Sequence, residues 1–479
     1  MYYKIIKQNR SFIHNEWVSS AGGEQLAVYD KYSGELLEKI PYLTSEQVAA
    51  AAKSSVGAFN ILQELSCQQR QLLLNKVIKG LQSEAPFFAD LIAREAGKPI
   101  QYAAQEVERC LSTLTFAAAE GPRFSGETIA MDYAAGVGKT ALTKPMAIGP
   151  ILAISPFNFP LNLALHKIAP ALILGLPILL KPSPLAPLTS LAFARLVQEA
   201  GFPAGALNVA ICDHTLAEKL VQDERFAMLS FTGSAKVGHH LRSLAGKKKV
   251  VLELGGNAGV IINDALDLPA VAKSVALGAY AYAGQICIST QRIIVQKKLY
   301  AKFKELLCGE IKLLKSGDPL QAHTVIGPLI SKKELLRVDE WVQNAVATGA
   351  KIVCGGFTQA SEHNIYAPTL LENTPTSAKI YRQEAFAPVA TLEAYDDFSE
   401  AIERVNDSVY GLQAGVFSNN IDYMKIAHDK LQVGAVIMNH VPGFRVETMP
   451  YGGVKDSGLG REGIRYAMME MTTPRLLVY

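Results

Sequence analysis

The sequence lacks cysteine pairs at C-x-x-C spacing and has no marked excess of charge of either sign. Its six cysteines are scattered over 479 residues, so neither a zinc site nor a disulfide framework is indicated, and no metal is expected. Reduced thiols in a cytoplasmic protein are the simplest expectation. The net charge is +3, from 47 Lys and Arg against 44 Asp and Glu. This balance gives no reason to expect nucleic acid or a membrane surface as a partner.

The sequence also lacks an uninterrupted apolar run of about 20 residues, the length that spans a bilayer. Its most apolar stretch, residues 148–180, contains five prolines, and we expect a buried strand, a loop, a helix, a loop and a strand there. Residues 1–10 are polar and basic, without the apolar core of a signal peptide. What is left is an ordinary globular composition, 49% hydrophobic and 19% charged, in a chain long enough for two to four domains.

The hydrophobic pattern predicts a helical start followed by two α/β regions. In the first hundred residues, apolar positions recur at helical spacing behind capping-box patterns at residues 44–47 and 66–69, and Gly97 is placed at the end of a third helix. From residue 147, short apolar runs alternate with helical segments, and a second such series begins at residue 258. This alternation is typical of βαβ units with parallel sheets.

Three polar residues stand where chemistry is plausible. Glu253 ends an apolar strand, where a carboxylate is costly unless it is solvated or used. Asn158 lies in the proline-bounded loop PFNFP. Its side-chain amide either donates a hydrogen bond to an oxyanion or only stabilises a turn. Cys287, in AGQICIST, is either a small buried hydrophobe or a nucleophile. These residues alone leave each pair of alternatives open.

A glycine-bearing turn follows another predicted strand, in SFTGSAKVG. Gly233 and Gly238 do not match the G-x-G-x-x-G dinucleotide pattern. A turn of this kind into a helix still presents backbone N–H groups to a pyrophosphate.

Together these segments resemble the aldehyde dehydrogenase superfamily, in the branch with succinate-semialdehyde, lactaldehyde and non-phosphorylating glyceraldehyde-3-phosphate dehydrogenases. The motifs that carry the resemblance follow in order along nearly the whole chain: PFNFP at 156–160, LLKPSP at 179–184, FTGS at 231–234, ELGG at 253–256, GQIC at 284–287, QEAFAPV at 383–389 and MPYGGVKDSGLGREG at 449–463. Any one of them is weak, but seven in this order are specific.

The resemblance implies an α/β fold with two parallel-sheet domains and a small β arm for oligomerisation. The implied boundaries are residues 1–124 and 146–253 for the cofactor-binding domain, 254–440 for the catalytic domain, and 125–145 and 460–479 for the arm. A homodimer or homotetramer is implied, and the sequence does not choose between them.

The implied activity is the NAD(P)-dependent oxidation of an aldehyde to a carboxylic acid. Cys287 would attack the carbonyl carbon, Asn158 would hold the oxyanion, and Glu253 would activate the water that hydrolyses the thioester. Two alternatives are a CoA-acylating aldehyde dehydrogenase and a catalytically inactive scaffold or binding protein. CoA-dependent product formation would reveal the first, and a role that survives loss of Cys287 would reveal the second.

The resemblance also places the cofactor. Lys181 would lie on the adenosine ribose and Glu384 on the nicotinamide ribose, within the set Pro156, Phe157, Lys181, Ser183, Pro184, Phe231, Gly233, Ser234, Glu384 and Phe386. Relatives that prefer NAD often carry a glutamate three residues after the lysine, where this chain has Pro184. We therefore expect NADP to be accepted, and whether it is preferred stays open.

The substrate residues depart from two family patterns. His166 stands where succinate-semialdehyde enzymes usually have an arginine, and Ile286 stands where enzymes for phosphorylated aldehydes often have one. Arg109 and Arg445 remain as candidate anchors for an anion, and with His166 they form the candidate substrate set. The alternative for either arginine is an ordinary ion pair. We expect a short polar aldehyde, hydroxylated or negatively charged, such as a lactaldehyde-like or semialdehyde-like compound.

Overall fold

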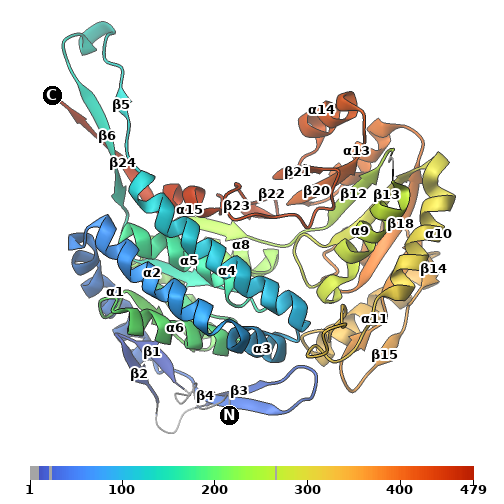
Figure 1. Ribbon diagram of the computed structural model, residues 1–479, viewed down its shortest axis with the longest axis horizontal. Helices are drawn as coiled ribbons and strands as arrows, with labels where there is room; N and C mark the ends of the chain where they lie inside the picture. Colours follow the sequence, from blue (N-terminus) through green and yellow to red (C-terminus); the bar gives the residue numbers. More distant parts are fainter. Residues whose placement is uncertain (1–9, 21–23, 265–266) are drawn as a thin grey trace.

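The computed structural model describes residues 10–20, 24–264 and 267–479. Two α/β bodies lie side by side, and a narrow β arm projects from the first of them (Figure 1). The predicted fold class is therefore confirmed. Residues 1–9 of the polar N-terminal segment, in which no signal peptide is expected, lie outside the described residues.

An eight-stranded sheet forms the centre of the first body. Its five middle strands, β9, β8, β7, β10 and β11, are parallel, and antiparallel strands flank them at both edges. In sheet order the strands are β2 (Glu16–Val18), β1 (Ser11–Ile13), β9 (Leu207–Val209), β8 (Ile178–Lys181), β7 (Ile151–Ile154), β10 (Met228–Thr232), β11 (Lys249–Glu253) and β23 (Gly458–Leu459). The last strand, β23, comes from near the C-terminus, so it brings a distant segment of the chain beside Glu253.

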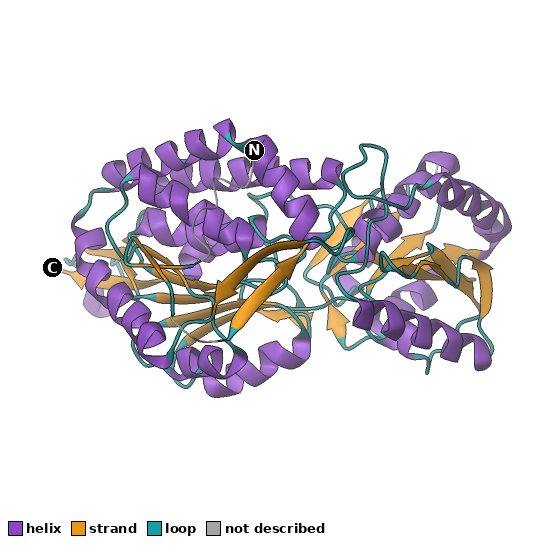
Figure 2. Ribbon diagram, turned by 90° about the horizontal axis from the view of Figure 1, so that it is seen from below, coloured by secondary structure: helices purple, strands orange, loops and turns teal. Residues whose placement is uncertain are grey.

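Helices cover both faces of this sheet (Figure 2). They are α1 (Ser45–Glu64), α2 (Cys67–Ser83), α3 (Ala85–Ala96), α4 (Ile100–Glu120), α5 (Asn162–Leu174), α6 (Leu188–Ala200), α7 (His214–Gln222), α8 (Ala235–Leu244) and α15 (Ile464–Glu470). Both predicted capping boxes are present, at the starts of α1 and α2. Gly97 ends α3 with φ of 66°, in the left-handed region that favours glycine, as predicted.

The expectation of an entirely helical first hundred residues is wrong for residues 11–41. Besides β1 and β2, this segment forms the hairpin of β3 (Gln25–Tyr29) and β4 (Leu36–Pro41). These strands have three to six residues each, too short for their alternation of buried and exposed positions to be distinctive. Their stability comes from tertiary pairing, such as that of Phe12 in β1 with Val209 in β9.

A seven-stranded sheet forms the second body. All neighbouring pairs are parallel except the antiparallel pair at one edge, β14 with β17. In sheet order the strands are β14 (Lys351–Cys354), β17 (Thr369–Glu372), β18 (Val389–Tyr395), β13 (Thr290–Gln296), β12 (Ala258–Ile262), β20 (Gln413–Phe417) and β21 (Ala435–Met438). The accompanying helices are α9 (Leu268–Tyr280), α10 (Lys297–Leu313), α11 (Lys332–Ala347), α12 (Lys379–Arg382), α13 (Phe398–Asn406) and α14 (Ile421–Lys430).

The apolar stretch 148–180 folds as predicted, into β7, α5 and β8. Twelve of the residues of α5 are buried, because this helix lies in the core of the first body rather than on its surface. Among the described residues, no helix has both the length and the apolar character needed to cross a bilayer.

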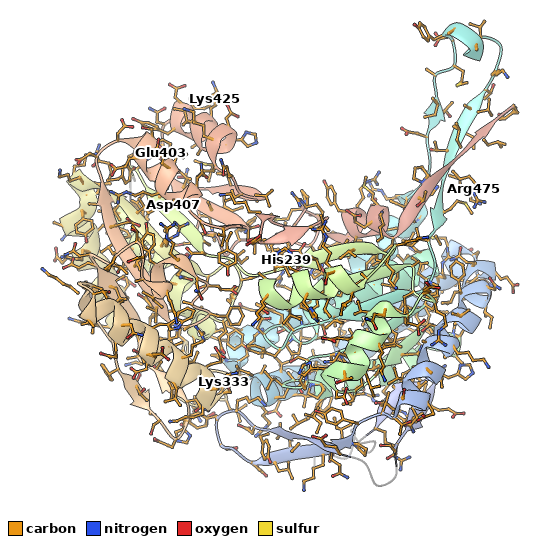
Figure 3. All side chains as sticks on the ribbon, turned by 180° about the vertical axis from the view of Figure 1, so that it is seen from behind. His239, Lys333, Glu403, Asp407, Lys425 and Arg475 are labelled. Carbon is orange, nitrogen blue, oxygen red and sulfur yellow. The ribbon has the colours of Figure 1, made fainter. Side chains whose placement is uncertain are left out.

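The arm is a three-stranded antiparallel sheet of β5 (Thr128–Ile129), β6 (Ala141–Ala147) and β24 (Thr472–Val478). β6 and β24 pair along their full lengths, from Ala141 with Val478 to Ala147 with Thr472. Figure 3 labels Arg475, which lies on β24 in the arm. The remaining strands form two small antiparallel pairs, β15 (Thr358–Ala360) with β16 (Ile365–Tyr366), and β19 (Tyr410–Gly411) with β22 (Val454–Lys455).

Candidate active site

The carboxyl ends of four parallel strands in the first sheet supply one wall of the site. β7 leads into the loop with Asn158, β8 ends at Lys181, β10 leads into Gly233, and β11 ends at Glu253. Ligands of open α/β sheets bind outside the carboxyl ends of the strands, where the connecting loops diverge. The four sequence motifs therefore meet because their strands share one edge of the sheet.

Cys287 comes from the second body, in a loop between the short helix η4 (Ala281–Gly284) and β13. Tyr282 and Ala283 in η4 have φ of 52° and 54°, a left-handed conformation that is strained for residues other than glycine and is often found at functional sites. A methyl group on Gly256 would lie 2.2 Å from the carbonyl oxygen of Cys287. The second glycine of ELGG thus permits the close approach of this loop.

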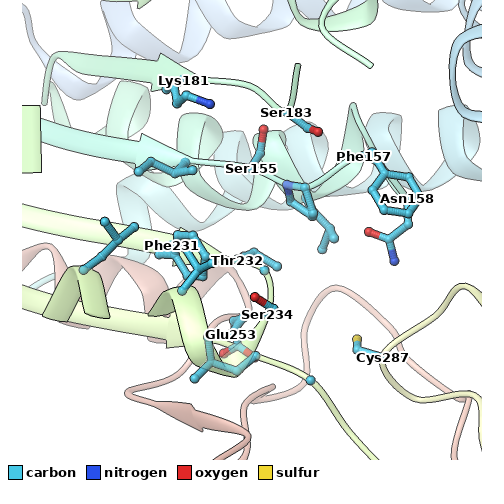
Figure 4. Close-up of a pocket in the computed structure, with 18 of the residues that line it drawn as sticks. Ser155, Phe157, Asn158, Lys181, Ser183, Phe231, Thr232, Ser234, Glu253 and Cys287 are labelled. Atoms are coloured by element: carbon cyan, nitrogen blue, oxygen red, sulfur yellow. The ribbon is translucent and has the colours of Figure 1, made fainter. Parts of the chain in front are cut away.

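A cavity of about 610 Å³ joins these segments (Figure 4). Every residue predicted for catalysis or cofactor binding lines it. They are Pro156, Phe157, Asn158, Lys181, Ser183, Pro184, Phe231, Gly233, Ser234, Glu253, Cys287, Glu384 and Phe386. Lys181 and Ser183 lie in the upper part of the view, and Cys287 lies at the lower right with Asn158 above it.

Asn158 is held in place by a hydrogen bond to the cysteine loop. Its side-chain nitrogen donates to the carbonyl oxygen of Gln285 at 2.9 Å, and the residue is only 3% exposed. A primary amide has two N–H groups, so one is left for another acceptor in the cavity.

Glu253 has a buried carboxyl group without a hydrogen-bond partner in the described part of the chain. Burial, followed by the charge of Glu462, raises its pKa well above that of an exposed glutamate, while Arg445 and Lys167 oppose the shift. A general base works best when its pKa is near the operating pH, and a raised carboxyl pKa moves in that direction.

The Cys287 thiol lies 3.1 Å from the phenol oxygen of Tyr451. Burial raises the pKa of this thiol to about 11, against the opposing effect of the Tyr451 hydrogen bond. The resting thiol is therefore protonated at neutral pH, and its reactivity depends on groups that stabilise the thiolate.

The cavity suits a dinucleotide at both ends. Ser234 is the N-cap residue of α8, but its side chain makes no capping hydrogen bond. The first N–H groups of the helix are therefore free for an anion. The side-chain oxygens of Ser155 and Thr232 are buried without partners in the described part of the chain. Glu384 accepts a hydrogen bond from the Gly256 N–H at 3.0 Å, and burial raises its pKa to about 7.

The lining of the cavity also contains residues that the sequence did not point to. His214, Glu218 and His240 are among them. Glu218 is a carboxylate, but it pairs with His240 at 2.9 Å. Arg337 and Glu334 line the cavity as well, and Arg337 donates to Glu334 at 2.7 Å.

None of the three candidate substrate residues is among the described residues that line this cavity. Arg109 donates to Glu447 at 2.8 Å. The fully buried His166 lies 2.6 Å from the other oxygen of the same carboxylate. Although burial opposes it, His166, Arg109 and Arg445 hold the pKa of Glu447 well below its ordinary value.

Arg445 is buried beside the reaction centre. Its guanidinium lies 3.6 Å from the centre of the Tyr451 ring and 3.4 Å from Glu462. Its Nε has no hydrogen-bond partner within the described residues. Glu462 in turn accepts from the buried Lys167 at 2.8 Å. We call Arg109, Lys167, Arg445, Glu447 and Glu462 the charged cluster.

Sequence reasoning missed Lys167, Glu447, Glu462 and Tyr451. Lys167 could have been noticed, because it lies in the apolar helix α5 and a buried cation requires a buried partner. Tyr451 and Glu462 lie within MPYGGVKDSGLGREG, which supported the resemblance without suggesting a role for either residue.

Comparison with known proteins agrees with this geometry. The profile of the aldehyde dehydrogenase family matches residues 17–477. The chain is 39% identical to 3-sulfolactaldehyde dehydrogenase of Priestia megaterium, over 99% of this chain and 98% of that protein. It is 36% identical to a lactaldehyde dehydrogenase of Methanococcus maripaludis, over 98% of this chain and 99% of that one.

Two solved structures are similar over nearly their full lengths. Aldehyde dehydrogenase 21 from Physcomitrella patens, solved with the product succinate, has a TM-score of 0.96 and 36% identity, covering 99% of this chain and 98% of that one. Glyceraldehyde-3-phosphate dehydrogenase from Methanocaldococcus jannaschii, solved with NADP, has a TM-score of 0.91 and 34% identity, covering 96% and 99%.

The chain therefore belongs to the aldehyde dehydrogenase family. The predictions of an oxidoreductase that acts on aldehydes, and of NAD(P) as its cofactor, are confirmed at this level.

Proposed function

We propose that this enzyme oxidises a short, polar, singly anionic aldehyde to the carboxylic acid, with Cys287 as nucleophile. The observation that carries the proposal is the shared cavity, in which Cys287, Asn158 and Glu253 converge beside a site suited to a dinucleotide. This convergence disfavours an inactive scaffold. The buried carboxyl group of Glu253 favours hydrolysis of the thioester over its transfer to CoA.

In the proposed reaction the Cys287 sulfur attacks the aldehyde carbon and forms a thiohemiacetal. The free N–H of Asn158 and the backbone N–H of Cys287 stabilise the oxyanion. Lys181 and Ser183 would hold the cofactor at one end and Glu384 at the other, and the cofactor would supply a hydride acceptor when bound. Loss of the hydride leaves a thioester on Cys287. Glu253 then takes a proton from the water that hydrolyses it, and the acid and the thiol are released.

We propose that the enzyme accepts NADP, and that Lys181 with Ser183 binds the 2′-phosphate. Pro184 presents no carboxylate to that phosphate, and Glu218, an acidic group in the lining, is paired with His240. The relative solved with NADP supports the same expectation.

The charge of the cluster supports an anionic substrate. Its three cations, Arg109, Lys167 and Arg445, face only two carboxylates, Glu447 and Glu462, both with lowered pKa. His166 is neutral at pH 7 because burial and Arg445 lower its pKa. One positive charge is therefore left over in the charged cluster, which matches one carboxylate or sulfonate. The name of one relative, 3-sulfolactaldehyde dehydrogenase, fits this class, because its substrate carries one sulfonate.

Replacing Arg445 with alanine is expected to raise KM for anionic aldehydes by about tenfold or more, because the fork of donors and the spare charge are lost. KM for a neutral aldehyde of similar size is expected to change by less than about twofold. Steady-state kinetics with succinate semialdehyde and butanal make the comparison. Equal increases in KM for both aldehydes would eliminate Arg445 as the anion anchor.

An aldehyde panel assayed with both cofactors tests the activity itself. We expect reduction of NADP with short anionic and hydroxylated aldehydes, product acid without added CoA, and kcat/KM for NADP at least equal to that for NAD. A hundredfold preference for NAD would refute the proposed cofactor site. Strict dependence on CoA would refute hydrolysis by Glu253.

We propose further that the arm assembles a homodimer or homotetramer of a cytoplasmic enzyme. Leu476 and Leu477 in β24, and Tyr479 directly after it, are more than half exposed. The free edges of the arm are able to pair with another sheet. The six cysteines are free thiols, as a reducing compartment would maintain them.

A further inference from the structure

Tyr451 is the one polar side chain in hydrogen-bond contact with Cys287 among the described residues. Its phenol oxygen lies 3.1 Å from Sγ, and the residue is 3% exposed. Ile288 and Leu412 belong to the same apolar cluster as Tyr451, and Cys287 packs against this cluster. The nucleophile thus has a fixed polar partner that the reaction described above does not use.

The backbone of Tyr451 is fixed by pairing with Glu462. Its N–H donates to the Glu462 carbonyl at 2.9 Å, and its carbonyl accepts from the Glu462 N–H at 2.7 Å. The Glu462 carboxylate binds Lys167 and Arg445, so the segment is tied to the first body. The Arg445 guanidinium covers the ring face at 3.6 Å. The phenol is therefore held at the sulfur by contacts on its backbone and on its ring.

The chemistry of the pair favours the phenol as donor once the thiol ionises. A thiolate has no proton and only accepts, so the Tyr451 O–H must point toward it. Burial raises the pKa of the Tyr451 phenol well above its ordinary value, so the phenol keeps its proton. Hydrogen bonds to charged groups are stronger than those between neutral groups. The contact therefore stabilises the thiolate more than the thiol.

The other charged groups that face Cys287 come from three segments. Glu384, after α12, and Glu253, at the end of β11, disfavour the thiolate, whereas Arg445 favours it. The Arg445 guanidinium lies against the ring of Tyr451 and draws electron density from the phenol, which makes the O–H a better donor. The cation acts on the sulfur both directly and through the tyrosine.

We propose that Tyr451 is a further catalytic residue, whose phenol donates a hydrogen bond to the Cys287 thiolate, with Arg445 as the positioning residue that holds and polarises this donor. The proposal rests on Cys287 as the nucleophile of the proposed function. Tyr451 keeps its proton throughout, and the thiol proton is released to water when the thiolate forms.

The test is the pH dependence of Cys287 alkylation by iodoacetamide in the full-length enzyme, followed by mass spectrometry of the Cys287 peptide. Alkylation replaces the S–H bond with an S–C bond and releases iodide and a proton, so its rate follows the thiolate fraction. For Tyr451→Phe we expect the midpoint to rise by about one pH unit and the rate at pH 7.5 to fall about tenfold. Arg445→Met keeps the phenol and is expected to shift the midpoint in the same direction by a smaller amount.

Tyr395→Phe is the matched control, because it removes an equally buried phenol oxygen bound to Asn263 at 2.8 Å in a separate cluster. Its midpoint is expected to equal that of the wild type. An unchanged or lowered midpoint in Tyr451→Phe would overturn the proposal, since the thiol would then be the donor. Thermal melting checks that the variant is folded, and if it is not, Tyr451→Leu, which also removes the phenol oxygen, takes its place and decides in the same way. Failure of the proposed function is separate: aldehyde oxidation would then survive in Cys287→Ala, whatever the alkylation profile shows.

Discussion

Replacing Cys287 with alanine is expected to lower kcat/KM for aldehyde oxidation by at least about a thousandfold, because the covalent route through the thiohemiacetal and thioester is lost. Binding of NADP, measured by fluorescence titration, is expected to stay within about twofold, since Cys287 contributes no charge to the cofactor end of the cavity.

Cys308→Ala is the matched control. Cys308 is a free, partly buried thiol on α10 and does not line the cavity, so its loss is expected to leave kcat unchanged. If Cys287→Ala retained most of its activity while Cys308→Ala did not, the nucleophile would have been assigned to the wrong residue.

Replacing Glu253 with glutamine is expected to separate the two halves of the reaction. The variant should still release one equivalent of NADPH per active site in a rapid burst, and then turn over about a hundred to ten thousand times more slowly, because no base activates the hydrolytic water. Stopped-flow absorbance at 340 nm measures both phases. Glu403→Gln, at an exposed position of α13, serves as the control and should behave as the wild type.

Glu253 also determines how the rate of thioester hydrolysis is expected to depend on pH. Glu253 acts as a base only when it is deprotonated, and its pKa is raised by burial. The wild-type hydrolysis rate is therefore expected to increase with pH through a midpoint well above that of an exposed glutamate. A Glu253→Gln variant with an unchanged burst and an unchanged steady-state rate would show that another group activates the water.

Much of the site was predictable because its residues belong to local motifs at strand ends. Asn158, Lys181 and Glu253 each follow a short buried strand, and the order of parallel strands brings such positions to one edge. Cys287 could be placed only through the resemblance, since its own segment gives no distinctive spacing. The structure also explains why residue 256 is a glycine: a side chain there would collide with the backbone carbonyl of Cys287.

The charged cluster was not predictable in this way. Arg109 meets Glu447, and Lys167 meets Glu462, across 338 and 295 residues of sequence. No local pattern encodes such pairs. As a result, the sequence left Arg109 and Arg445 each as either an anion anchor or a member of an ordinary ion pair, whereas the fold gives each a carboxylate partner.

The central claim is that the aldehyde becomes a thioester on Cys287. The most direct test mixes Glu253→Gln enzyme with succinate semialdehyde and NADP, quenches it in acid within seconds, and measures the mass of the Cys287 peptide. We expect a succinyl adduct on Cys287 that needs NADP to form and is removed by hydroxylamine. An unmodified Cys287 peptide after a full burst of NADPH, or an adduct on another cysteine, would contradict it.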